Sequence, residues 1–265
     1  MLLLLCILLF QPDTASLRRL FEQEFARHHT AQAARDLGLF LARHGDATGA
    51  REALREALRM EPQNLADSFE LALVSPAGEA EPLLQRAAAG RDTVLAARSF
   101  AALGHLRDAT GDKTGAAEAY RSAIALRESA NTFEALANDV DPVEGISLLQ
   151  RALAMNRREL GARHPQTATT EANLAGMLLN AGQTDASIRL IREAMAIFEE
   201  RLGVEHPRVA AAATILAFGL RAKGDRAGAE RYYRRALAID GAAYGAAHPQ
   251  TVSDARTLAD FLQAP

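Results

Sequence analysis

The sequence is poor in the residues on which several common kinds of protein site depend. It contains no tryptophan, one cysteine and only 5% aromatic residues. The single cysteine, Cys6, excludes an internal disulfide and any metal site built from several cysteines. Runs of Val, Ile and Thr, which favour strands, are also missing, whereas helix-forming Ala, Leu, Arg and Glu dominate. With 49% hydrophobic residues the chain can build a core, so we expect a folded, all-α protein.

An excess of one charge is absent as well. The formal net charge is −3, and acidic and basic residues alternate along the chain instead of forming blocks. Without a basic patch there is no electrostatic reason to expect a nucleic-acid partner. Residues 1–10 are apolar throughout, but they are about half of the roughly 20 residues that a helix needs to cross a bilayer. We therefore expect no transmembrane span.

The apolar run at the start of the chain has the length of the hydrophobic part of a secretory signal. Thr14, Ala15 and Ser16 follow it and provide a small-residue cleavage region. We therefore expect residues 1–16 to be a signal peptide and the protein to be exported, either secreted or periplasmic. The signal is atypical because no Lys or Arg precedes Leu2. A cytoplasmic protein, with an incorrectly assigned start or a buried N-terminal helix, is the alternative.

A repeat of 42 residues runs through the second half of the chain. His164-Pro165, His206-Pro207 and His248-Pro249 recur at this spacing. Other positions keep the same spacing, including Ala152, Ala194 and Ala236, Leu174-Ala175, Leu216-Ala217 and Leu258-Ala259, and Gly182 and Gly224. Each unit has two apolar-periodic stretches separated by a glycine, with proline at the start of a pair, which predicts repeated helix pairs.

These motifs resemble the tetratricopeptide repeat family. Residues 152–263 are similar to its kinesin light chain subclass, whose 42-residue unit contains the stretch LGxxHPxTA. Residues 160–168, LGARHPQTA, match this stretch at every named position, whereas Val209 and Val252 depart from it in the later copies. The resemblance implies a right-handed superhelical solenoid of antiparallel helix pairs.

The first half of the chain resembles the ordinary 34-residue form of the repeat. Residues 31–64 carry its landmarks at Leu37, Gly38, Gly45, Ala50, Leu54, Ala57 and Pro62, and a second good copy has Gly104, Gly111, Ala116, Tyr120 and Ala123. Degenerate copies lie between and after them, with loops expected at residues 74–80 and 139–142 because of their prolines. We expect about six pairs in all. The organisation is an N-terminal helix at 17–30, 34-residue-type pairs at 31–151, kinesin light chain-type pairs at 152–249 and a capping helix at 250–265.

No recognisable catalytic, nucleotide or metal motif is present. The three His-Pro histidines sit at equivalent places in neighbouring repeats, about 10 Å apart, whereas zinc needs its ligands within roughly 2.0 to 2.3 Å of one ion. We expect them to serve helix entry. Residues 111–115, GDKTG, lack the order of a phosphate-binding loop and lie between two predicted helices. We therefore expect a protein that is not an enzyme and needs no cofactor.

The resemblance implies a protein-interaction scaffold that binds a peptide or a partner protein of unknown identity in its concave groove. In the family the first helix of each pair lines this groove. The matching positions here are Gln32, Arg35, Arg43, Arg98, His105, Asn173, Asn180, Arg221 and Arg256. Ordinary solvated residues on a curved surface would give the same pattern. The alternative function is structural self-assembly, in which exposed repeat ends join two copies into a weak homodimer.

Overall fold

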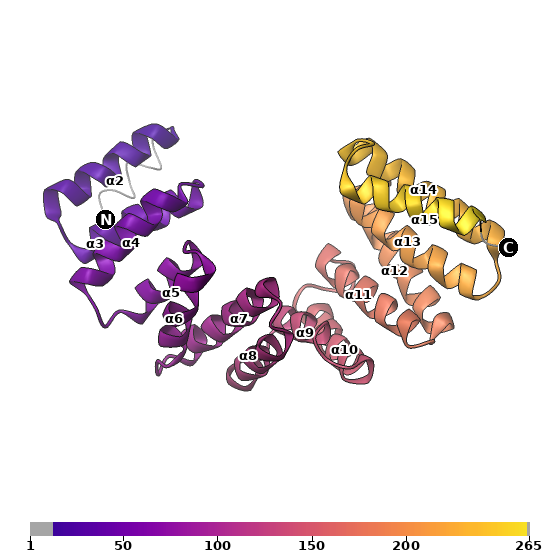
Figure 1. Cartoon of the computed structure of the whole chain (residues 1–265), viewed down its shortest axis with the longest axis horizontal. Helices are drawn as coiled ribbons and strands as arrows, with labels where there is room; N and C mark the ends of the chain where they lie inside the picture. The colour runs from indigo at the N-terminus through magenta and orange to yellow at the C-terminus, as the bar shows by residue number, and fades with distance from the viewer. Residues whose placement is uncertain (1–12, 264–265) are drawn as a thin grey trace. The chain divides into compact units, whose positions relative to one another are not determined.

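The computed structural model describes residues 13–263, which form fourteen helices and no strand (Figure 1). The helices are α2 (Thr14–His28), α3 (Ala31–Arg43), α4 (Ala47–Met60), α5 (Leu65–Leu73), α6 (Ala77–Ala88), α7 (Thr93–Thr110), α8 (Lys113–Leu126), α9 (Ala130–Ala137), α10 (Pro142–Glu159), α11 (Pro165–Asn180), α12 (Thr184–Leu202), α13 (Pro207–Ala222), α14 (Arg226–Tyr244) and α15 (Pro249–Gln263). The all-α prediction is confirmed.

The chain divides into two compact units, residues 1–127 and 128–265. Neighbouring helices pack as antiparallel pairs within each unit. The first unit holds the pairs α3/α4, α5/α6 and α7/α8, and the second holds α9/α10, α11/α12 and α13/α14. Helix α2 packs on α3 in the first unit, and α15 packs on α14 in the second.

Small residues at the crossing points let the two helices of a pair approach closely. A Cβ atom on Gly104 of α7 would lie 2.4 Å from Cε1 of Tyr120 in α8, and one on Gly38 of α3 would lie 2.7 Å from Cγ of Leu54 in α4. Tyr120 and Leu54 are fully buried. The repeat landmarks therefore mark the contact between paired helices, as the stacking of such units requires.

Caps and glycines set the ends of the helices. Gly182 and Gly224, in the turns inside the 42-residue units, have φ values of 76° and 79°, a left-handed conformation that favours glycine. Pro165 and Pro207 occupy the first position of α11 and α13. Proline is tolerated there because its missing N–H would have no partner inside the helix. The expected turns are thus where the sequence places them.

The loop expected at residues 74–80 is shorter than the prolines suggest. Helix α6 begins at Ala77, and Pro82 lies inside it. A proline at this position removes the hydrogen bond to the carbonyl of Gly78 four residues earlier. Both residues are exposed, so water can satisfy that carbonyl, and the helix continues. The prediction of a loop up to Ala80 was wrong for this reason.

The first twelve residues of the expected signal peptide lie outside the described part of the chain. Thr14, Ala15 and Ser16 form the first turn of α2, whose N-terminus is capped by Asp13 through a hydrogen bond of 2.8 Å from the Ser16 N–H. The role of residues 1–16 in export stays a prediction. Among the described residues no helix combines the length and the apolar character that crossing a membrane requires.

Candidate interaction groove

The three His-Pro histidines cap helices, as expected from their spacing. The Nδ1 atom of His164 accepts a hydrogen bond of 3.0 Å from the Gln166 N–H, and His206 and His248 accept equivalent bonds of 3.1 and 3.2 Å. Each imidazole thus satisfies a backbone donor in the first turn of its own helix. No cluster of three potential metal ligands occurs between residues 13 and 263.

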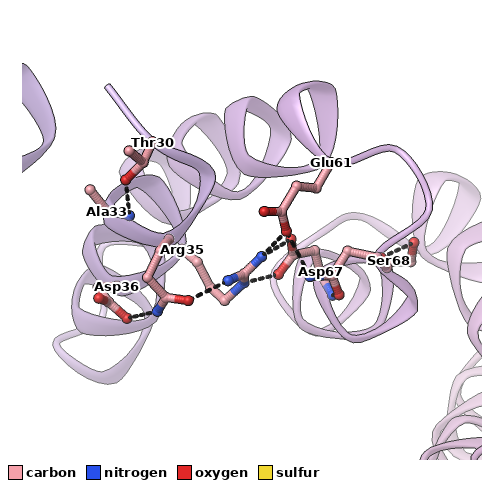
Figure 2. A network of polar contacts seen from close by, with 9 residues as sticks. Thr30, Ala33, Arg35, Asp36, Glu61, Asp67 and Ser68 are labelled. Atoms are coloured by element: carbon pink, nitrogen blue, oxygen red, sulfur yellow. Dashed lines mark hydrogen bonds and ion pairs between the residues drawn. The ribbon is translucent and has the colours of Figure 1, made fainter. Parts of the chain in front are cut away.

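Arg35, a predicted groove residue, is held inside a network of polar contacts (Figure 2). Its guanidinium donates hydrogen bonds of 2.8 Å to Asp67 on α5 and 2.8 Å to Glu61 before α5. Asp67 is fully buried, and this hydrogen bond raises the pKa of Arg35. Gln32 accepts another bond from Arg35 and donates to Asp36 at 2.8 Å. Arg35 therefore links α3 to α5, and its N–H donors bond to residues of the protein itself.

The other predicted residues of the first unit have mixed surroundings. The Arg98 guanidinium lies 4.5 Å above the Phe69 ring, and His105 Nδ1 is 2.8 Å from the Tyr120 hydroxyl. Arg43 is exposed and borders a hollow of about 350 Å³ between α2 and α3. The hollow is lined by Leu17, Phe21, Asp36, Leu39, Phe40, Arg43 and His44. Of the five predicted residues in this unit, only Arg43 borders this hollow.

In the second unit two predicted residues meet at one groove. It lies between α11 and α13, the first helices of consecutive pairs, and has a volume of about 540 Å³. Its lining residues are Gly176, Leu179, Asn180, Ile215, Phe218, Arg221 and Ala222. Asn180 and Arg221 supply the polar groups, whereas the walls are aliphatic and aromatic. Such an apolar hollow with a few polar groups is typical of ligand sites in proteins.

A difference between two repeats produces the hollow. Gly176 and Phe218 occupy equivalent positions, 42 residues apart, so one wall lacks a side chain and the other carries a large ring. A Cβ atom on Gly176 would meet only Ile215 Cδ1, at 3.8 Å, which is ordinary contact. Phe218 is 37% exposed. The groove is therefore open space bordered by an accessible aromatic ring.

The charge of the groove comes from Arg221. Its guanidinium lies 5.9 Å from the centre of the Phe218 ring. The Phe218 ring packs edge-on against Tyr233, with ring centres 5.4 Å apart. Burial raises the pKa of Tyr233, and the nearby Arg221 charge opposes this rise. Arg221 itself is exposed and is the one charged residue in the lining. The site thus joins an apolar surface to a cation and an amide.

Asn173 and Arg256, also predicted for the groove, lie outside its lining. Asn173 is exposed on α11 near Glu134. Burial raises the pKa of Glu134, and the nearby polar groups of Thr170 and Asn173 oppose this rise. Arg256 is exposed on α15. Ile215 and Phe218 were not predicted, because apolar residues at regular helix positions are normally assigned to the core. The signal for Phe218 was the replacement of glycine, at Gly176, by phenylalanine at the equivalent position of the next repeat.

Comparisons with known proteins agree with this architecture. One tetratricopeptide repeat family model matches residues 135–200 and 168–242, and a second matches residues 97–129. Together they cover just over half of the chain. The chain belongs to the tetratricopeptide repeat family, which confirms the assignment made from its motifs. No curated protein matches the chain.

Several solved structures share the fold. BtubC (BKLC) from P. vanneervenii is 22% identical, with a TM-score of 0.65 over 77% of this chain and 91% of that one. PilF from Pseudomonas aeruginosa is 18% identical, with a TM-score of 0.62 over 88% and 99%. Kinesin light chain TPR-like repeats from Podospora anserina are 22% identical, with a TM-score of 0.57 over 69% and 98%. At these identities the likeness establishes the fold alone.

Proposed function

We propose that the protein is an interaction scaffold that binds a peptide segment of a partner in the groove between α11 and α13. Tetratricopeptide repeats are commonly protein-interaction scaffolds. The observation that carries the proposal is the joint position of Asn180, Phe218 and Arg221 around one open hollow. Each of the three offers a different contact, so they suit a ligand with both a side chain and polar backbone groups.

The chemistry of the lining defines the ligand that fits. An apolar side chain of the peptide packs between Ile215 and the Phe218 ring. The Asn180 amide can donate to a backbone carbonyl and accept from a backbone N–H at the same time. Arg221 donates several hydrogen bonds in one plane and prefers a carboxylate. The preferred segment is therefore extended, apolar at one position and acidic beside it.

A peptide library selected on the purified protein tests this proposal. The Asn180→Ala/Arg221→Ala double variant should bind a selected peptide about 10- to 100-fold more weakly, since each lost buried bond costs roughly 1 kcal/mol or more. Asn173→Ala is a matched control, because Asn173 lies on the same helix and outside the lining. Equal affinity of wild type and double variant, with unchanged circular dichroism, would remove the groove as the binding site.

Self-association is a second candidate, favoured by an exposed face of α15. Val252, Ala255, Ala259 and Leu262 are exposed, whereas their counterparts 42 residues earlier on α13 are buried. Those counterparts are Ala210, Ala213, Ala217 and Leu220. A second copy packing on this face would give a weak dimer whose mass in light scattering rises with concentration. A monomer at all concentrations would exclude it.

A further inference from the structure

Two carboxyl groups meet in the interior where α15 packs on α14. Asp240 on α14 and Asp254 on α15 are 3% and 6% exposed. Asp254 Oδ1 accepts a hydrogen bond of 3.2 Å from the Gln250 amide, while Asp240 Oδ1 and Asp254 Oδ2 have no partner within the described residues. Among the described residues, neither Asp240 nor Asp254 forms an ion pair. A buried pair of this kind is costly when both groups are ionised.

The equivalent positions in the two preceding repeats carry no such conflict. Each pair joins the second helix of one repeat to the first helix of the next, with a separation of fourteen residues. Asn156 donates a hydrogen bond of 2.9 Å to Thr170 at the first of these junctions. Phe198 and Ala212, both buried, form the second. Of the three equivalent pairs, only Asp240 and Asp254 have side chains that can be ionised.

The physical setting favours retention of a proton at this junction. Burial raises the pKa of Asp240 to about 6, and the neighbouring Asp254 carboxyl acts in the same direction. A protonated carboxyl can donate a hydrogen bond to the other carboxylate. Once that proton is lost, two like charges face each other away from water.

The other titratable groups on α13, α14 and α15, and in the turn between α14 and α15, form no ion pair with Asp240 or Asp254 within the described residues. They are Arg208 and Arg221 on α13; Arg226, Glu230, Arg231, Tyr232, Tyr233, Arg234, Arg235 and Tyr244 on α14; His248 in the turn; and Arg256 and Asp260 on α15. Arg226 donates hydrogen bonds of 3.4 Å to the carbonyls of Phe261 and Leu262. Arg234 pairs with Glu230 and Arg235 with Glu199. His248 is exposed, stacks on Tyr244 with ring centres 4.6 Å apart and accepts the Gln250 N–H. None of them neutralises the aspartate pair by an ion pair.

We infer that a proton shared by Asp240 and Asp254 controls how firmly α15 is docked on α14. Helix α15 is held more firmly in mildly acidic solution and opens more often at neutral pH. Its other contacts include the Phe261 ring, whose centre lies 5.2 Å from that of Tyr233, and the Thr251 hydroxyl, which donates to the Asp240 carbonyl at 3.1 Å. At the C-terminal end of α15, Arg226 donates hydrogen bonds of 3.4 Å to the carbonyls of Phe261 and Leu262. These contacts keep α15 attached, so the proton changes the frequency of opening.

The direction of the effect follows from linkage. Asp240 has a higher pKa when α15 is docked than when it is exposed to water, so the docked state binds the proton more tightly. The stabilisation is complete below the ordinary pKa of an aspartate and is lost as the pH rises through about 6. Between pH 5 and pH 7.5 the opening of α15 should therefore increase about tenfold.

Hydrogen exchange followed by mass spectrometry tests the inference on the full chain. After correction for intrinsic rates, amides of α15 should lose about tenfold in protection between pH 5 and pH 7.5. In Asp240→Asn the change should fall below about twofold, because the group with the raised pKa is gone. In Asp254→Asn the change should shrink but persist, because burial still raises the pKa of Asp240 while the second charge is lost. Amides of α13 are the internal control, because α13 packs on α12 through the apolar pair Phe198 and Ala212 and should show no such change in protection. Equal α15 protection at both pH values in wild type would overturn the inference, as would an unchanged pH dependence in both variants.

Discussion

At the scale of single residues, the contact between Arg35 and Asp67 shows why a predicted binding residue can be structural. Asp67 is fully buried on α5, and the Arg35 side chain is 17% exposed. A buried charge left without its partner is strongly destabilising, since neither water nor another group replaces the lost hydrogen bonds. An arginine that binds a ligand needs free N–H donors. The donors of Arg35 already bond to Asp67, Glu61 and Gln32.

Asp67→Ala should lower the free energy of unfolding by about 2 to 3 kcal/mol. The loss stays below the 3 to 5 kcal/mol typical of a broken buried pair, because Arg35 retains Glu61 and is partly exposed. Urea denaturation followed by circular dichroism measures it. Glu79→Ala, which removes an exposed ion pair with Arg55, is the matched control and should cost below about 1 kcal/mol. Equal losses in the two variants would mean that the Arg35 contact contributes no more than a surface pair.

At the scale of helices, the same substitution should have opposite effects at two glycines. Gly104→Ala places a Cβ atom 2.4 Å from Tyr120, which is buried and hydrogen-bonded through its hydroxyl and therefore has little room to move. Overpacking should cost about 1 to 3 kcal/mol, more than the 0.5 to 1 kcal/mol gained from replacing a helical glycine. Gly176→Ala meets no close atom and should stabilise by about 0.5 to 1 kcal/mol. Urea titrations showing the same sign for both would refute this account.

Sequence reasoning predicted the elements that repeat and missed the features that do not. The His-Pro caps and the glycine turns recur at fixed spacing, so their roles follow from the sequence alone. Pro82 was misread because its tolerance depends on the exposure of Gly78. Asn180 and Arg221 were predicted for the groove, but which predicted residues share one hollow depends on the missing side chain at position 176. The Asp240 and Asp254 pair escaped notice because only packing brings α14 and α15 together.

At the scale of the whole molecule, each unit has its own buried side chains, and the groove is contained in the second unit. The largest described core cluster lies there, formed by residues of α11 to α15 that include Ile191, Phe198 and Leu216. Helices α11 and α13 pack on this core, so the groove residues are expected to keep their places before a ligand arrives. Preorganisation of this kind lowers the entropy lost on binding.

The most direct test of the groove fills it with a side chain. Gly176→Leu puts an isobutyl group where the structure has open space, and the protein should remain folded. Gly78→Leu is the matched control, since Gly78 is also a helical glycine and nothing lies near its missing Cβ atom. Calorimetry with a peptide selected on the wild type measures the dissociation constant for all three proteins. We predict at least about tenfold weaker binding for Gly176→Leu and a change within about twofold for Gly78→Leu. Wild-type affinity in a correctly folded Gly176→Leu variant would contradict the proposal that this groove receives the partner.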